Sequence, residues 1–363
     1  MSGDIPVNVT PPAPPPLRVA AITGGLNEPS SRFRVRQYIP MLAENGIAVK
    51  EYIPFKSRSD THWYNSYPLP VQVLPQLWAT ALRVVAKVPA IVGSYQADIT
   101  WIQREFLTPV ASTEVLTHRP RLFDVDDAIW LRMRATSGFA KWIARRMDGV
   151  ICGNQWIADY FADCGTPSWV IPTGVDTDYW HPPTEPSSRP FQFGWMGTSG
   201  NLRYLYEIED ALAAVLGKCP DARLLVVSDK APKFSRLPMD RVIYLPWTAG
   251  GEADTMRQMD VGLMPLEDSE WERGKCSFKA LTYMASGIPI VVSPVGMNQE
   301  LLASGKVGFG PKGPDEWVDV LSHLYQDDAV RRAMGAEGRL AIADRYAIDV
   351  TGRQLMAAFR QMV

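Results

Sequence analysis

The stretch that decides the fold is residues 260–294, which read DVGLMPLEDSEWERGKCSFKALTYMASGIPIVVSP. The apolar runs at its two ends, 260–266 and 288–294, are typical of buried strands. Between them, 279–286 has a mostly apolar helical pattern, and ASGIPIVV makes a tight return from helix to strand. A strand, a helix and a second strand in this order predict a βαβ unit and a mainly parallel sheet.

The same alternation continues on both sides of this unit. Further strands are predicted at 17–23, 48–53, 98–103, 121–125, 149–153 and 168–172, and again at 191–196, 223–228 and 241–246. Helices are predicted at 30–44, 139–147, 154–162, 201–216, 251–259, 315–326, 329–346 and 349–363. We therefore expect an α/β protein with two Rossmann-like, doubly wound domains that face each other across a cleft.

A segment rich in Pro, Thr and Ser separates the two series of strands. It reads PTGVDTDYWHPPTEPSSRP at 172–190 and has no apolar period, which is typical of an interdomain linker. The expected organisation is a flexible Pro-rich tail at 1–16, an N-terminal domain at 17–175, a linker at 176–190, a C-terminal domain at 191–345, and a helix at 346–363 that can cross back to the N-terminal domain.

Charge indicates the kind of partner to expect. The chain has 363 residues and a formal net charge of -2, so no strong overall field favours nucleic acid. Residues 1–150 carry a net charge of +5 and the remainder -7. A basic N-terminal half suggests an anionic partner such as phospholipid, although random scatter of surface charge would give the same count.

The cysteines indicate the compartment. The four thiols form no CxxC pair and have no His at ligand spacing, which argues against a zinc site and a disulfide scaffold. A reducing compartment fits best, so we expect a cytoplasmic protein.

No apolar run approaches the roughly 20 residues that a membrane span needs. The nearest candidate, LWATALRVVAKVPAIV from Leu77, contains Arg83 and Lys87. It is either an amphipathic helix in a membrane interface or a surface helix that faces the core. Trp142 lies close to Arg145 and to other cationic residues, which suggests peripheral attachment to the inner face of a membrane.

The segment GWMGTSGNLRYL at 194–205 combines a strand, a turn and a helix start. Gly197, Thr198 and Ser199 offer small side chains, hydroxyls and free backbone N–H groups at the helix N-terminus. This combination is typical of a diphosphate cradle, although many ordinary helix caps share it.

Two lysines of the first stretch, Lys275 and Lys279, are expected one helical turn apart on a shared face. The helix dipole disfavours lysine at a helix start, unless a phosphate lies between the lysine and the positive end of the dipole. Glu270 and Glu272 precede the lysines and could accept hydrogen bonds from sugar hydroxyls. The alternative is a surface cluster of Glu–Lys pairs, which contributes little.

Gly24 and Gly25 follow the first strand and allow the backbone to approach a ligand closely. The rest of a GxGxxG fingerprint is absent, so a nicotinamide dinucleotide site is weakly supported and a plain turn is the alternative. Arg32 and Arg34 come next, at a predicted helix start where the dipole disfavours them. They indicate an anionic ligand or a carboxylate partner.

FDVDDAIW at 123–130 places three carboxylates at the end of a strand. Such crowding raises at least one pKa or demands cationic partners. Asp126 and Asp127 could be a general base, acceptors for sugar hydroxyls or part of a metal site. They could equally cap a helix and pair with an arginine.

Together these segments resemble a known family. The run GKCSFKALTYMASGIPIVVSPVG, with VGLMPL before it and NQELL after it, is similar to retaining nucleotide-sugar glycosyltransferases of the GT-B fold, in family 4 of the group 1 type. IPTGVDTDYW, FDVDDAIW and SSRFRVRQYIPMLAENGI share the resemblance, which covers roughly residues 17 to 346. Each piece alone is weak, but the combination in this order is specific.

The resemblance implies that the N-terminal domain binds the acceptor and the C-terminal domain the nucleotide sugar, with no metal or other cofactor. A positive pair would stabilise the leaving diphosphate. The expected catalytic residues are Lys275, Lys279, Glu272, Asp126 and Asp127. The expected donor-binding residues are Gly197, Thr198, Ser199, Arg203 and Glu300. The expected residues of the acceptor side or cleft loops are Gly24, Gly25, Arg32, Arg34 and Asn154.

The sequence departs from the family motif of two glutamates eight positions apart. Aligned on YMASG, these positions are Gly274 and Thr282. The second glutamate normally holds the nucleotide ribose, so ribose recognition is in doubt. Glu272 is expected to replace the first.

The usual arginine after the GWMG strand is also missing, since Thr198 stands there. Lys275 and Lys279 are expected to supply the charge, with Arg203 as a lesser candidate. An inactive relative is the alternative that these departures raise.

The expected reaction moves a sugar from a nucleotide-sugar donor to a glycan or lipid-linked acceptor, with retention of configuration, in cell-surface polysaccharide assembly. The departing phosphate oxygen would take the proton of the attacking hydroxyl. Two other classes stay open. One is a hydrolysing nucleotide-sugar epimerase of the same fold, with Asp126 and Asp127 as its acid/base pair. The other is a non-catalytic nucleotide- or glycan-binding relative.

Overall fold

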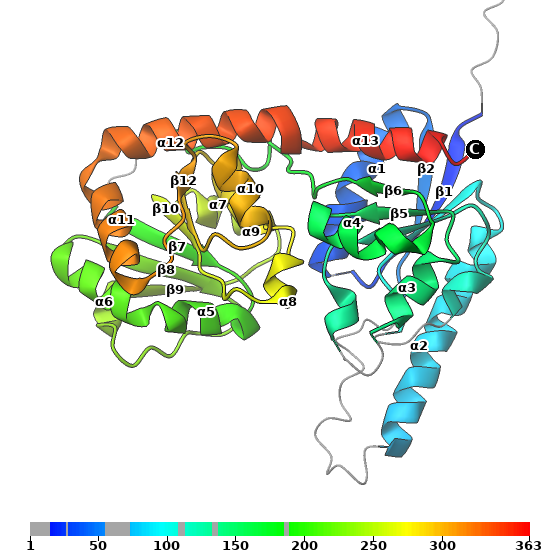
Figure 1. Cartoon of the computed structure of the whole chain (residues 1–363), viewed down its shortest axis with the longest axis horizontal. Helices are drawn as coiled ribbons and strands as arrows, with labels where there is room; N and C mark the ends of the chain where they lie inside the picture. Colours follow the sequence, from blue (N-terminus) through cyan, green and yellow to red (C-terminus); the bar gives the residue numbers. More distant parts are fainter. Residues whose placement is uncertain (1–14, 27, 55–72, 108–112, 133–136, 185–188) are drawn as a thin grey trace, which may run out of the picture.

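The computed structural model describes residues 15–26, 28–54, 73–107, 113–132, 137–184 and 189–363. Most of the expected tail, residues 1–14, lies outside this part of the chain. The described residues form two α/β domains, each built on a six-stranded sheet in which all paired strands are parallel (Figure 1). This confirms the predicted pair of doubly wound domains.

The N-terminal sheet has the strand order β2-β1-β3-β4-β5-β6. Its strands are β1 (Leu17–Ile22), β2 (Ile47–Tyr52), β3 (Ile99–Gln103), β4 (Arg121–Val125), β5 (Gly149–Cys152) and β6 (Ser168–Val170). Its helices are α1 (Ile39–Glu44), α2 (Val73–Ser94), α3 (Phe139–Ala144) and α4 (Gln155–Phe161). The predicted helix at 30–44 is helical throughout its second half, but residues 31–38 form π and 3-10 turns before α1.

The C-terminal sheet has the order β12-β11-β10-β7-β8-β9. Its strands are β7 (Gln192–Met196), β8 (Arg223–Ser228), β9 (Val242–Pro246), β10 (Val261–Met264), β11 (Ile290–Val292) and β12 (Gly308–Phe309). Its helices are α5 (Leu202–Glu207), α6 (Glu209–Lys218), α7 (Glu252–Met256), α8 (Glu270–Arg273), α9 (Phe278–Ala285), α10 (Met297–Ala303), α11 (Pro314–Gln326) and α12 (Asp328–Ala341).

Several details of this domain differ from the prediction. Helices α8 and α10 were not predicted, and the helix expected at 329–346 changes to a π-helical turn after Ala341. The single helix expected at 201–216 is divided at Ile208 into α5 and α6. The strand β12 was not predicted, because two residues are too short for any apolar period to show.

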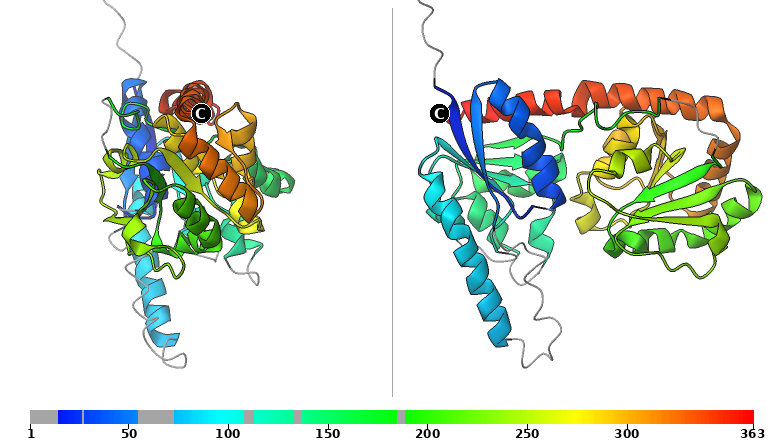
Figure 2. Two further views of the ribbon diagram at one scale, coloured as in Figure 1. Left: turned by 90° about the vertical axis from the view of Figure 1, so that its left-hand side faces the viewer. Right: turned by 180° about the vertical axis from the view of Figure 1, so that it is seen from behind.

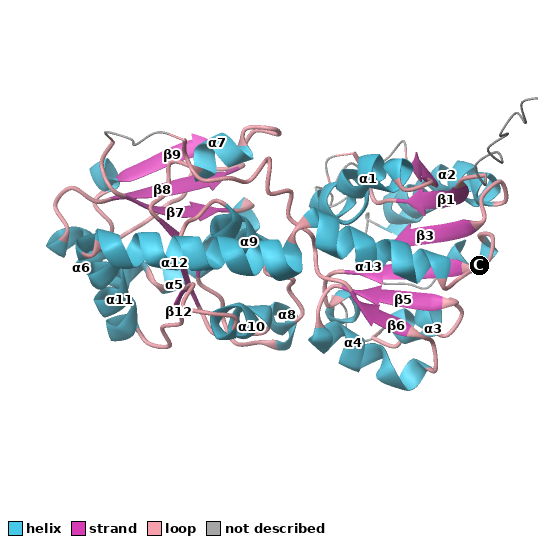
Figure 3. Cartoon of the chain, turned by 90° about the horizontal axis from the view of Figure 1, so that it is seen from above, coloured by secondary structure: helices cyan, strands magenta, loops and turns pink. Residues whose placement is uncertain are grey.

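The last helix, α13 (Ile348–Arg360), returns to the N-terminal domain. Figures 1 and 3 show α12 and α13 end to end across both domains. In α13 the Phe359 ring packs edge to face against the buried Trp101 ring, with 5.3 Å between ring centres. Thr351 of the same helix shares a 2.9 Å hydrogen bond with the Tyr38 hydroxyl. An isolated β-bridge pairs Val175, near the end of the N-terminal domain, with Ala347, where the chain returns to that domain. The C-terminal segment is thus part of the core of the first domain (Figure 2).

Candidate active site between the domains

A cavity of about 330 Å³ lies between the domains. Arg32 and Phe33, from the helical segment after β1, form one side of it. Gly197 after β7, Trp247 after β9 and Lys279 of α9 form the other. Ligands of doubly wound sheets bind beyond the carboxyl ends of the strands, so this cavity is where the fold places a ligand. We call it the donor cavity.

Lys279 is the cation that α9 contributes to this cavity. Its Nζ lies 4.7 Å from the centre of the Trp195 ring and beside Gly197, where an added Cβ would approach Nζ to 3.1 Å. Burial, together with the nearby charge of Lys275, lowers the pKa of Lys279 to about 7. In the described part of the chain no carboxylate forms an ion pair with it. A half-buried lysine without a counter-ion is suited to an anionic ligand.

The expectation that Lys275 shares a helix face with Lys279 is wrong. Lys275 precedes α9, and Ser277 between them turns the chain with a left-handed φ of 47°. Lys275 does not line the donor cavity; its Nζ lies 5.9 Å from the ring centres of both Tyr204 and Trp271. Its charge nevertheless acts on Lys279 and on Asp127.

The loop after β7 lines the cavity through Gly197 and Thr198. A Cβ at Gly197 would lie 2.8 Å from the Trp195 ring, so only glycine fits there. The sequence predicted a free backbone N–H at Ser199, but this N–H donates to Asp229 Oδ1 at 2.6 Å. The Ser199 hydroxyl donates to Asp229 Oδ2 at 2.8 Å. These bonds lower the pKa of Asp229, which also lines the cavity. The sequence reasoning missed Asp229, although it follows β8 directly.

Glu272 lies behind this surface. Its side chain is fully buried and accepts hydrogen bonds from Tyr204, from Ser269 and, at 3.1 Å, from Arg203. Arg203 also pairs with Glu267 at 3.0 Å, and neither Arg203 nor Glu272 lines the donor cavity. The structure therefore places both as supports that hold α8 against α5, and does not place them at the donor as the sequence suggested.

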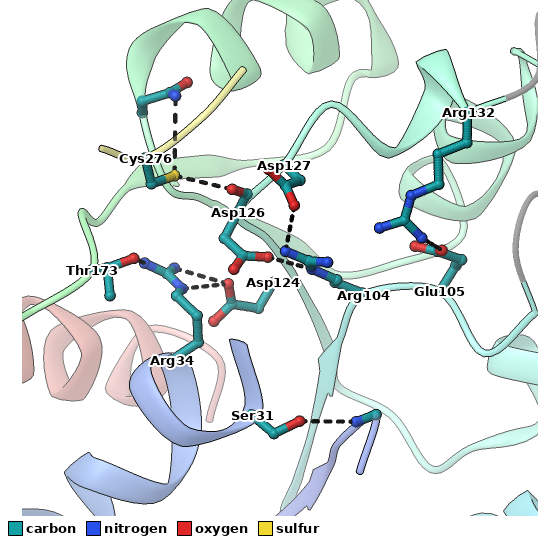
Figure 4. Close-up of polar contacts among 12 residues, drawn as sticks. Ser31, Arg34, Arg104, Glu105, Asp124, Asp126, Asp127, Arg132, Thr173 and Cys276 are labelled. Atoms are coloured by element: carbon teal, nitrogen blue, oxygen red, sulfur yellow. Dashed lines mark hydrogen bonds and ion pairs between the residues drawn. The ribbon is translucent and has the colours of Figure 1, made fainter. Parts of the chain in front are cut away.

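The acidic turn after β4 is held by one arginine (Figure 4). Arg104 binds Asp126 at 2.5 Å and Asp127 at 2.7 Å. Burial acts to raise the pKa of both carboxyls. For Asp126 the charge and hydrogen bond of Arg104 outweigh burial, and the net effect is a lowered pKa. For Asp127 burial prevails, and the net effect is a raised pKa. The crowded carboxylates thus have the cationic partner that the sequence demanded, and they differ in proton affinity.

Arg104 itself was not predicted as a site residue. It is the first residue after β3 and has a left-handed φ of 62°, which is costly for a residue with a side chain. Its position after a strand end was the available signal. A small hollow beside it is lined by Gly24, Ser30 and Gln103 among others. The amide Nε2 of the buried Gln103 has no hydrogen-bond partner among the residues that the structure describes.

Arg34 has a carboxylate partner, one of the two alternatives that the sequence left open, and does not reach the acceptor side that the resemblance implied. It is 3% exposed and pairs with Asp124 at 2.8 Å (Figure 4). It also donates to the carbonyl of Ile171 at 2.7 Å. These contacts saturate it inside the first domain, so it cannot orient an acceptor. Arg32, in contrast, lines the donor cavity and crosses to Glu252 of the second domain at 2.7 Å.

The loop between α8 and α9 closes the domains against each other. Asn154, which caps α4, donates to the carbonyl of Lys275 at 3.1 Å, and the Cys276 thiol donates to the carbonyl of Asp126 at 3.2 Å. A Cβ at Gly274 would lie 2.6 Å from Cβ of Ala128. The glutamate of the family motif has no room here, which is a physical reason for glycine at this position.

We expect Gly274→Val to keep each domain folded but to prevent this closure, because the added side chain meets the backbone of the acidic turn. Small-angle scattering should show a larger radius of gyration than the wild type, together with a large loss of turnover. Gly313→Val, at a partly exposed position where an added Cβ would meet open space, is the control. An unchanged radius of gyration and full activity would contradict the account of closure.

Glu300 does not reach the donor cavity. It lies on α10 and lines a second crevice with Asn154 on the other side of the Gly274–Ser277 loop. Glu300 was expected to contact the donor, but the structure places it outside the donor cavity.

Comparison with known proteins agrees with this geometry. Residues 192–327 match the family model for glycosyl transferases group 1. The lipopolysaccharide core biosynthesis mannosyltransferase of Rhizobium meliloti is 24% identical over 259 residues, covering 63% of this chain and 70% of that protein. The D-inositol 3-phosphate glycosyltransferase of an Arthrobacter species is 29% identical over 194 residues, covering 47% of this chain and 45% of that protein.

Solved structures extend the likeness to the whole fold. Anabaena HepE in complex with UDP and glucose has a TM-score of 0.71 at 16% identity and covers 95% of this chain and all of that one. Sucrose-phosphate synthase of Thermosynechococcus elongatus has a TM-score of 0.68 at 15% identity over 95% and 98% of the two chains. The molecule thus has the two-domain GT-B fold. Its C-terminal domain carries the match to the glycosyl transferases group 1 family model, and the curated relatives that the chain resembles are glycosyltransferases.

Proposed function

We propose that this protein is a glycosyltransferase that moves a sugar from a nucleotide-diphosphate sugar to a glycan or lipid-linked acceptor, with retention of anomeric configuration and without a metal ion. The observation that carries the proposal is Lys279, a half-buried lysine with no ion-pair partner in the described part of the chain, facing a cavity that both domains line. A role in cell-surface polysaccharide assembly is supported by the similarity to a lipopolysaccharide core mannosyltransferase.

The cavity offers a separate surface for each part of a donor. Lys279 and the Gly197–Thr198 turn would face the diphosphate, and Lys279 would stabilise the charge that develops as it leaves. The Trp247 indole offers an apolar wall for a base. Arg32 is held by Glu252 across the domain boundary, so it contributes to closure around the donor.

The acceptor would enter from the N-terminal domain. The segment after Gly25 borders both spaces, since Pro29 lines the donor cavity while Gly24 and Ser30 line the hollow beside Arg104. Asp126 and Asp127 would orient the attacking hydroxyl from there, with Arg104 as their positioning residue. The C–O bond to the diphosphate breaks as the new C–O bond forms on the same face, and a departing phosphate oxygen takes the hydroxyl proton.

Product analysis tests this function. With each of a panel of nucleotide sugars and simple sugar acceptors, in EDTA, we expect transfer only when acceptor is present. The product should have the donor's anomeric configuration, read from the anomeric coupling in proton NMR. An inverted product, or a requirement for added metal, would contradict the proposal. Steady turnover of the donor without acceptor would indicate an epimerase instead, with Asp126 and Asp127 as its acid and base.

A second part of the proposal is attachment to an anionic membrane surface through α2. The helix projects from the N-terminal domain (Figure 1), and its outward side chains Trp78, Val85, Val88 and Val92 are 47–62% exposed. The opposite side, with Ala86 and its small neighbours, is buried. A surface helix normally places polar side chains outward, whereas the outward side chains of α2 named here are apolar. In the part of the chain that the structure describes, no helix could span a membrane.

The charge of the region favours lipid as the occupant. α2 contains no Asp or Glu, and the N-terminal part of the chain has a net positive charge. We expect sedimentation with phosphatidylglycerol vesicles that weakens in high salt and is lost in the Trp78→Ser/Val85→Ser variant. Leu340→Ser, which removes an equally exposed apolar side chain from α12, is the control. Equal binding by all three proteins, or no binding at any salt concentration, would exclude α2 as the lipid surface.

A further inference from the structure

The second crevice is as large as the donor cavity and shares none of its lining residues. It has a volume of about 400 Å³ and opens beyond the carboxyl ends of β5 and β11. Gln155 and Trp156 of α4 line it from the first domain, and Arg273 and Gln299 line it from the second. The Gly274–Ser277 loop separates it from the donor cavity, since Gly274 lies against Trp156 on one side and Ser277 leads into α9 on the other.

Its chemistry combines a fixed aromatic ring with flat polar side chains. Trp156 is half-buried and stacks on Trp130 at 5.4 Å, and Trp130 stacks on Tyr160 at 3.5 Å, so the indole is rigidly supported. Gln155 and Gln299 are exposed at the rim and each can donate and accept hydrogen bonds. A rigid ring with amides around it is suited to a ligand that has one apolar face and hydroxyls along its edge.

The charges of the crevice select against anions. Asp159, Asp268 and Glu300 line it, and the one lining cation, Arg273, is already paired with Asp268 at 2.8 Å. Asp159 accepts a hydrogen bond from Gln155 at 2.7 Å and adds its charge to the same rim. A phosphate or a uronate would therefore meet net repulsion, whereas a neutral hydroxylated ligand would find both donors and acceptors.

We propose that this crevice binds a neutral saccharide unit of the acceptor glycan, at a distance from the bond that is formed. The proposal rests on the proposed function. Both domains line the crevice, so an occupant stabilises the closed arrangement in which the donor cavity is also complete. Binding of saccharide and of nucleotide should therefore strengthen each other by the same factor.

The test uses the full chain and saturation-transfer NMR with methyl α-mannoside, methyl α-glucoside and methyl β-galactoside, alone and with saturating UDP or GDP. We expect at least one glycoside to bind, to remain bound with nucleotide present, and to bind more tightly then. Gln155→Ala and Gln299→Ala should each weaken its binding about tenfold, since each removes a hydrogen-bonding partner. Gln326→Ala, at an exposed position on α11, should change nothing.

The outcomes separate the two proposals. Displacement of the glycoside by nucleotide, binding unaffected by both glutamine variants, or no glycoside binding to a protein that binds nucleotide would overturn the crevice proposal. Nucleotide should bind all three glutamine variants like wild type. Glycoside binding that depends on Gln155 and Gln299 in a protein that binds no nucleotide would support the crevice and contradict the donor site.

Discussion

Lys279→Met should reduce turnover by about 100-fold or more while leaving the protein folded. The substitution keeps the volume of the side chain and removes the one cation that faces the donor cavity from α9. Loss of a single preorganised group that stabilises developing charge costs about 10²–10³ in kcat. Steady-state kinetics with the accepted donor measure the effect. Lys218→Met, at the exposed end of α6, is the matched control and should retain full activity.

The pH dependence of nucleotide binding gives a second readout of the same residue. Burial and Lys275 lower the pKa of Lys279 to about 7, and a diphosphate favours the protonated amine. Affinity should therefore be highest below pH 7 and fall as pH rises above it, with a proton taken up on binding. Lys279→Met should remove this decline. A decline that persists in the variant would assign the titration to another group.

Without ligand, the same pKa has the opposite consequence for stability. The folded-state pKa of Lys279 lies below 10.5, the ordinary value for a lysine, so between pH 7 and 10.5 the unfolded chain binds more protons than the folded protein. The contribution of this lysine to the free energy of unfolding therefore increases with pH in that window. Bound diphosphate should reduce this increase, since it raises the pKa of the amine.

Arg34→Met should lower the free energy of unfolding of the N-terminal domain by about 3–5 kcal/mol. Asp124 is 1% exposed, and among the described residues the substitution leaves Trp101 as its remaining side-chain hydrogen-bond partner. A buried carboxylate without a cationic partner is costly. Urea unfolding measures the change. Arg18→Met removes half of the exposed pair with Asp98 and should cost less than about 1 kcal/mol.

This comparison also tests the role of Arg34. If Arg34→Met unfolds like Arg18→Met but loses activity, the guanidinium acts on a ligand, as the sequence suggested, and the structural assignment is wrong. A less stable variant whose turnover per folded molecule is unchanged would confirm that the pair belongs to the core.

The alternation of strands and helices could be predicted because both signals are local. All strands named from the sequence are present, within one to three residues at their ends, and the crossing of α13 follows from an apolar pattern that continues to the C-terminus. The end-to-end placement of α12 and α13, in contrast, depends on packing against the first domain through Thr351 and Phe359.

The site was less predictable because it depends on contacts between distant segments. Spacing indicated that Lys275 and Lys279 share a face, but the left-handed turn at Ser277 starts α9 after Lys275. The strand-end rule directed attention to Asp126 and Asp127, which lie in the turn after β4 against Cys276 of the second domain. Nothing local showed that Arg104, more than twenty residues earlier, pairs with both. Arg34 carries the same sequence signal as Arg32, and only the fold separates a core arginine from a cavity arginine.

The most direct measurement is the shift in melting temperature of the full chain with UDP-, GDP-, ADP-, TDP- and CMP-linked sugars, for wild type and Lys279→Met. A ligand that binds only the folded protein at about 100 times its Kd adds about 2.7 kcal/mol to stability, which is a shift of several degrees. We expect one nucleotide class to stabilise the wild type and to have little effect on the variant. If no nucleotide sugar shifts the wild type, or if wild type and variant shift equally, the cavity at Lys279 is not a donor site.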